Sequence, residues 1–134
     1  MEPTKIFIVE DEFIIAKGLA RKLDKLGYQV VGIVSSGEEA LIQIQKTTPD
    51  LVLMDVLIEG EMDGIETATQ LLREFNIPVI YLTAYSDDKT LERAEQSGCY
   101  GYILKPFKQR ELHATIRMAL RKHQSGKASA MSNS

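Results

Sequence analysis

The stretch TPDLVLMD, residues 48–55, decides how this chain folds. Its Pro-Asp pair is a turn signal, and the LVLM that follows is apolar without the alternation of a half-exposed strand. An unbroken apolar run of this length predicts a strand that is covered on both faces, as in a parallel sheet. The run ends in Asp55, so we expect a carboxylate at the carboxyl end of a buried strand.

Four more runs read as strands, and a segment with helical spacing of apolar residues follows each of the five. The predicted strands are 5–9, 29–34, 51–54, 78–82 and 100–104, and the predicted helices are 13–26, 38–46, 65–75, 87–96 and 109–122. Ser36 is expected to cap the second helix. Because parallel strands need long crossover connections, this alternation predicts an α/β fold, a doubly wound (βα)5 unit with a five-stranded parallel sheet in the order 2-1-3-4-5.

Size and composition bound the domain organisation. A chain of 134 residues with 44% hydrophobic and 26% charged residues fits one globular domain. We place that domain at residues 1–123 and expect 124–134, which are small and polar, to form a disordered tail or linker stub. A net charge of -3, a single cysteine and the lack of a long apolar run argue against nucleic-acid binding or membrane insertion by this segment and indicate a cytoplasmic location.

Chemically active side chains follow four of the five predicted strands. Glu10-Asp11-Glu12 follow the first strand, Asp55 the third, Thr83 the fourth and Lys105 the fifth. Ligands of open parallel sheets bind beyond the carboxyl ends of the strands, so these groups should share one crevice. Carboxylate oxygens in such a set suit Mg²⁺.

A carboxylate in this setting can attack a phosphoryl group. Asp55 is the candidate nucleophile, while Mg²⁺ and Lys105 would neutralise the phosphoryl oxygens. Thr83 could donate its hydroxyl to the new group. Taken singly, the acids could serve a helix N-terminus, Lys105 could be a surface residue and Thr83 an ordinary strand residue. Their coincidence at four strand ends favours the site, whereas His113 and His123 fall in the last helix and are expected at the surface.

These residues also carry a resemblance. The chain, from about Lys5 to Lys122, resembles the receiver domains of two-component response regulators, which have a flavodoxin-like fold. The matching motifs are IVEDE at 8–12, LVLMD at 51–55, DGIE at 63–66, YLTA at 81–84 and GYILKPF at 101–107.

The resemblance implies a metal site and a phosphoacceptor. Asp11 would bind Mg²⁺ directly, Glu10 would act largely through water, and the backbone carbonyl of Leu57 would complete the protein ligands together with Asp55, the phosphoacceptor. In this family the phosphoryl donor is a sensor histidine kinase or a phosphotransfer protein, and the receiver is a switch and not an enzyme.

The resemblance also implies switch residues. Thr83 and Lys105 would contact the phosphoryl group, a cis peptide would precede Pro106, and Tyr102 would turn inward as Thr83 moves. The switch would act on an effector or output domain through the surface of the fourth helix, the fifth strand and the fifth helix.

Kinase docking is implied for the first helix. Ile14, Ile15 and Gly18 match the docking positions, and the alternative that Ile14 is an ordinary exposed residue stays open. The chain also departs from the family pattern twice. Seven residues separate Asp55 from Asp63, one more than usual, with Glu59-Gly60 where a proline commonly stands. CYGY at 99–102 replaces the ADDY of members that dimerise through charged pairs, so we expect a monomer or weak dimer.

Other functions on this fold are testable alternatives. A flavin carrier needs a loop that binds anions after the first strand, and EDE would repel phosphate. A phosphatase with an aspartate nucleophile needs a second acid two residues after Asp55, where Leu57 stands. A scaffold that is not phosphorylated would leave Asp55 inert.

Overall fold

In the part of the chain that the structure describes, five strands alternate with five helices, as the sequence predicts. The computed structural model describes residues 2–58, 60–84 and 88–132, with side chains through residue 126. In chain order the elements are β1 (Lys5–Val9), α1 (Phe13–Lys25), β2 (Gln29–Val34), α2 (Gly37–Thr47), β3 (Leu51–Asp55), α3 (Gly64–Phe75), β4 (Val79–Thr83), α4 (Asp88–Gln96), β5 (Gly101–Leu104) and α5 (Gln109–Ser132). Asp87, the predicted start of the fourth helix, lies outside the described residues.

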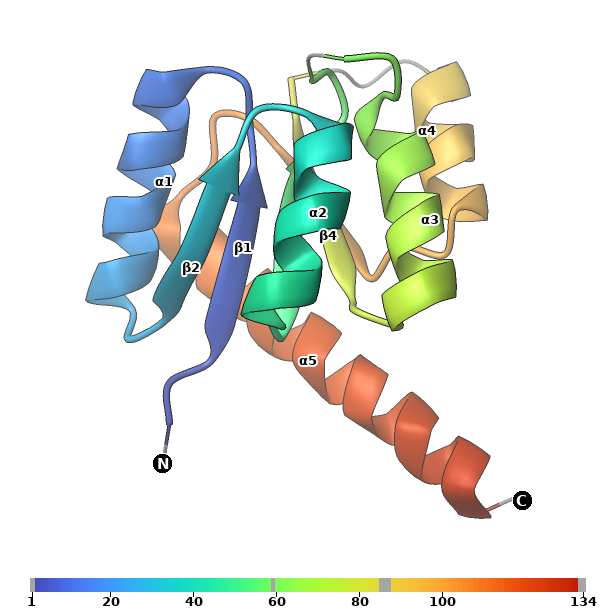
Figure 1. Ribbon diagram of the computed structural model, residues 1–134. Helices are drawn as coiled ribbons and strands as arrows, with labels where there is room; N and C mark the ends of the chain where they lie inside the picture. The colour runs from blue at the N-terminus through green and yellow to red at the C-terminus, as the bar shows by residue number, and fades with distance from the viewer. Residues whose placement is uncertain (1, 59, 85–87, 133–134) are drawn as a thin grey trace.

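The strands form one parallel sheet in the order β2-β1-β3-β4-β5, which confirms the predicted doubly wound topology. Figure 1 shows α2 and α3 in front of the sheet and α5 behind it. β3 lies at the centre, between β1 and β4. Because all strands point the same way, their carboxyl ends meet at one edge, and that edge holds the candidate site.

Each face of the sheet has its own hydrophobic cluster. Alternate strand residues such as Ile8 and Leu53 pack with α1 and α5, while their neighbours Phe7 and Met54 pack with α2, α3 and α4. Every residue of β3 and β4 is buried, as expected for strands that are covered on both sides. This packing fixes where the polar residue after each strand emerges.

The starts of α2 and α3 are fixed by capping side chains. The Ser36 hydroxyl accepts a hydrogen bond from the backbone N–H of Glu39 at 3.2 Å, so the predicted cap of α2 is confirmed. Asp63 caps α3 through a reciprocal capping box with Glu66, at 2.8 and 3.1 Å. That cap also ends the loop after β3, which borders the site.

The end of the chain differs from the prediction. α5 continues to Ser132, beyond the helix end predicted at residue 122, while the division into a domain at 1–123 and a tail or linker stub at 124–134 stays a prediction. The segment contains no proline, and a helix that is already docked extends without a new nucleation step. Figure 1 shows α5 running out beyond the rest of the domain. Among the described residues, no helix combines the length and apolarity that crossing a bilayer requires.

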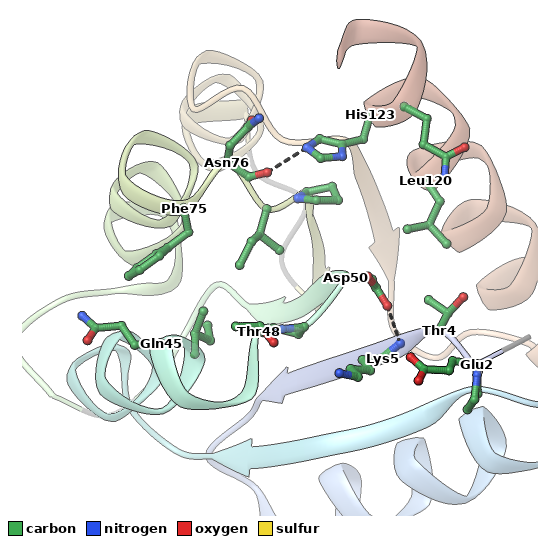
Figure 2. Close-up of a pocket in the computed structure, with 16 residues that line it drawn as sticks. Glu2, Thr4, Lys5, Gln45, Thr48, Asp50, Phe75, Asn76, Leu120 and His123 are labelled. Atoms are coloured by element: carbon green, nitrogen blue, oxygen red, sulfur yellow. Dashed lines mark hydrogen bonds between the residues drawn. The ribbon is translucent and has the colours of Figure 1, made fainter. Parts of the chain in front are cut away.

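His123 also corrects an expectation, because the sequence placed it at the surface. His123 is buried, with 8% exposure, and its Nε2 atom lies 2.7 Å from the carbonyl oxygen of Asn76, which ends α3 (Figure 2). Because a carbonyl only accepts, this nitrogen carries the proton and donates it. His113 is half-buried and its Nδ1 lies 3.3 Å from the Tyr28 hydroxyl. Helical periodicity could not place the middle of α5, at His123, against the end of α3.

Candidate functional site

Three carboxylates from two neighbouring strands meet at the carboxyl edge of the sheet. Glu10 and Asp11 follow β1 directly, and Asp55 ends β3, which pairs with β1. One carboxylate oxygen from each lies within 4.8 Å of the others. The grouping expected from the sequence is therefore present in the fold.

Lys105 reaches into this cluster from the end of β5. Its Nζ atom lies 2.8 Å from Oδ2 of Asp55 and 2.5 Å from Oε1 of Glu10. Its backbone N–H donates to the carbonyl of Thr83 at 2.9 Å, which ties the ends of β4 and β5 together. The peptide bond between Lys105 and Pro106 is cis, as the resemblance implied.

The Asp55 side chain is buried and held at both oxygens. Only 8% of the residue is exposed. The backbone N–H of Leu57 donates to Oδ1 at 3.0 Å, while Lys105 contacts Oδ2. The carboxylate is therefore fixed in orientation and still lies at the open edge of the sheet.

Burial and crowding set the protonation of the group. Burial, and to a lesser extent the charge of Asp55, raise the pKa of Glu10 to about 7, although the bond to Lys105 opposes that shift. Burial also works to lower the pKa of Lys105, but hydrogen bonds and charges from Asp55 and Glu10 outweigh it and raise that pKa above its ordinary value. The ammonium of Lys105 therefore stays charged, while Glu10 is poised between its neutral and charged forms near pH 7.

This donor set fits a divalent cation. Three carboxylates face one ammonium, so their mutual repulsion is only partly neutralised. Mg²⁺ takes oxygen ligands and is commonly held by one or two carboxylates with several waters. Glu10, Asp11 and Asp55 supply such oxygens, while the role expected for the Leu57 carbonyl stays a prediction.

The two predicted switch residues lie on neighbouring strands. Thr83 is fully buried at the end of β4, one position beyond Leu82, the residue that pairs with Asp55. Tyr102 is half-buried in β5 and packs against the cluster on the α3 and α4 side. Their positions agree with the resemblance, and their movement stays a prediction.

The predicted docking residues lie on an outward face of α1. Ile14 is 85% exposed, Gly18 is exposed and Ile15 is half-buried. Phe13, 70% exposed with the Lys17 ammonium 5.3 Å from its ring centroid, extends this apolar surface. Sequence periodicity did not single out Phe13, because nothing in it separates an exposed aromatic at a helix start from a buried one.

The sequence also did not predict the role of Glu38, which contacts the loop after β3. From the first turn of α2, its Oε1 atom accepts hydrogen bonds from the backbone N–H groups of Glu61 at 3.1 Å and Met62 at 3.2 Å. A hydrogen bond to its own backbone N–H, followed by these two, lowers its pKa. The only sequence signal was an acid at a helix start.

A groove of about 790 Å³ lies at the opposite edge of the sheet, where the strands begin. Figure 2 shows it between the middle of α5, with Leu120 and His123, and residues before β1 and β3, such as Thr4 and Asp50. None of the predicted site residues lines it. Size alone therefore does not locate the chemistry of this protein.

Comparisons with known proteins agree with the geometry. Residues 6–117 match the family model of the response regulator receiver domain. The transcriptional regulatory protein PdtaR of Mycobacterium tuberculosis is 36% identical over 118 residues, which cover 88% of this chain and 57% of PdtaR. This chain spans about half the length of the curated relatives it matches.

Solved structures give the same picture. The signal receiver domain of a modulated diguanylate cyclase from Desulfovibrio desulfuricans matches with a TM-score of 0.88 and 36% identity, covering 93% of this chain and 99% of the other. The BeF3-activated receiver domain of RstA from Klebsiella pneumoniae matches with a TM-score of 0.82 and 31% identity, covering 88% and 99%.

Proposed function

The chain belongs to the response regulator receiver family, and on that premise we propose that Asp55 accepts a phosphoryl group from a histidine kinase in a Mg²⁺-dependent reaction. The observation that carries this proposal is the pair of contacts on Asp55. Its carboxylate is buried, oriented by Leu57 and paired with Lys105, and two further acids stand beside it. No other described group has this combination of nucleophile, cation and acid cluster.

The transfer needs little from the protein beyond position and charge. A carboxylate oxygen of Asp55 attacks phosphorus, the bond between phosphorus and the kinase histidine breaks, and an acyl phosphate forms while the electron pair returns to the imidazole. Mg²⁺ would be held by Asp11, Asp55 and the Leu57 carbonyl, with Glu10 acting through water, and would offset charge on the phosphoryl oxygens. Lys105 is already 2.8 Å from the acceptor and would move onto the new group.

The signal would pass through the end of β4. Thr83 follows the strand that pairs with β3, and its carbonyl accepts the Lys105 backbone N–H, so movement at the phosphoryl group reaches β5. Tyr102, in the next strand, would repack in response. The output surface would be that of α4, β5 and α5, where Leu104 is 44% and Met118 72% exposed.

The donor would dock on α1. Ile14 and Gly18 are exposed close to the site, because α1 begins two residues after Asp11. Phe13 adds an exposed ring to the same helix start. Receiver domains of response regulators interact with histidine kinases and effectors, and this apolar patch is where we place the first of these partners.

Two alternative functions on this fold remain distinguishable. A phosphatase would release phosphate continuously, yet Leu57 stands where its second acid would be needed. A scaffold would not react at all. The RstA receiver is described as BeF3-activated, and beryllofluoride resembles a phosphoryl group in shape and charge, so the same probe suits this chain.

The test is intact-mass analysis after incubation with a small phosphodonor, with and without Mg²⁺. A single stable phosphoryl group that requires Mg²⁺ supports the proposal, and Asp55→Asn should abolish it. Asp50→Asn is the matched control, since Asp50 lies at the other end of β3. Labelling of Asp55→Asn at the wild-type rate would show that the acceptor lies elsewhere.

A further inference from the structure

Seven residues, 56–62, separate Asp55 at the end of β3 from Asp63, the N-cap of α3. The described residues of this loop are 56–58 and 60–63. At its base the Gly64 N–H donates to the Val56 carbonyl at 2.8 Å, and the Leu57 N–H donates to Asp55 at 3.0 Å. Hydrogen bonds within the loop therefore hold the end that leaves the strand.

A side chain from a different helix holds the far end. Glu38 Oε1 accepts two successive backbone N–H groups, those of Glu61 and Met62. Gly60, immediately before them, has φ of +101°, and a Cβ atom there would stand only 2.3 Å from Glu38 Oε2. The glycine thus gives both the backbone turn and the room that the carboxylate needs.

These contacts link α2 to the segment that carries Leu57. We propose that Glu38 is a positioning residue that fastens this loop to α2 and thereby helps to hold the Leu57 backbone where its carbonyl would bind Mg²⁺. The inference rests on the proposed function, since Leu57 is a metal ligand only there.

The chemistry suits such a fastening. A carboxylate that accepts two backbone N–H groups makes stronger hydrogen bonds than a neutral acceptor does. Mutation of a residue that orients a metal ligand commonly lowers metal affinity by about 10- to 100-fold. Because Glu38 is exposed and acts through a loop, we expect the low end, a loss of about tenfold in Mg²⁺ affinity.

The experiment measures Mg²⁺ binding by the unphosphorylated chain through amide NMR shifts, together with hydrogen exchange of the Glu61 and Met62 amides. Glu38→Ala should weaken Mg²⁺ binding and speed exchange at both amides. Glu38→Gln retains an acceptor oxygen without the charge, so its Mg²⁺ affinity and amide exchange rates should lie between those of the wild type and those of Glu38→Ala. Glu92→Ala, which removes a carboxylate from the exposed face of α4, is the control for net charge.

The possible outcomes distinguish a failure of this inference from a failure of the proposed function on which it rests. Unchanged Mg²⁺ affinity in Glu38→Ala, or an equal loss in Glu92→Ala, overturns the positioning role. Protection of the Glu61 and Met62 amides that survives Glu38→Ala overturns the fastening itself. If the wild-type chain binds no Mg²⁺, the metal role fails together with the proposed function, while amide exchange still decides whether Glu38 holds the loop. Glu38→Gln gives the same tests if Glu38→Ala fails to fold.

Discussion

Lys105 and Asp55 lie 50 residues apart in the sequence, yet the lysine Nζ atom stands 2.8 Å from the aspartate Oδ2 atom. The same ammonium also contacts Glu10, so one positive charge serves a group of three carboxylates. Negative charge remains in excess at this edge of the sheet. That excess attracts a cation, whereas the lysine itself repels one.

Replacing Lys105 with methionine should therefore separate two properties of the site. Without the ammonium, Mg²⁺ should bind about tenfold more tightly, since one like charge a few ångströms away is removed. Phosphorylation should become slower, because the oxygens of the phosphoryl group lose a neutralising partner. Magnesium titration and intact mass measure the two effects on the same sample.

Lys108→Met is the matched control, because Lys108 is exposed just before α5. It should leave Mg²⁺ affinity nearly unchanged. If Lys105→Met bound Mg²⁺ more weakly than the wild type, the ammonium would be supporting the carboxylate geometry and not competing with the metal.

Replacing Gly64 or Gly18 with alanine should change the free energy of unfolding in opposite directions. A Cβ atom on Gly64 would lie 2.0 Å from the Asp55 carbonyl oxygen, so Gly64→Ala should lower the free energy of unfolding by about 1–3 kcal/mol. Gly18 lies within α1 with nothing within 4 Å of that position, so Gly18→Ala should raise it by about 1 kcal/mol. Urea denaturation measures both values, and equal effects would contradict the close approach at Gly64.

The hydrogen bond between His123 and Asn76 gives a third prediction. His123→Ala leaves a carbonyl at the end of α3 without its donor and should lower the free energy of unfolding by about 1–3 kcal/mol. His123→Gln keeps an N–H donor and should recover part of that loss. If both variants were as stable as the wild type, the hydrogen bond from His123 would not be holding the middle of α5 against α3.

The sequence predicted the sheet and its site because both depend on local signals. Apolar runs such as LVLM locate the strands, and the parallel topology then brings Asp55, Thr83 and Lys105 to one edge. His123 and Glu38 carry no such signal. Each acts on the backbone of a distant segment, at Asn76 and at residues 61–62, and only the packed structure brings those segments together.

The docking surface gives the last prediction. Ile14 is 85% exposed on α1, so Ile14→Asp should fold normally but should place a charge within the apolar patch proposed for the kinase. Phosphotransfer from a phosphorylated histidine kinase that labels the wild-type chain should fall about tenfold or more, because a buried unpaired charge weakens an interface. Labelling by a small phosphodonor should not change, since the chemistry at Asp55 is untouched. Met118→Asp, on α5, should leave the kinase reaction intact, and an equal loss in both variants would place the kinase elsewhere.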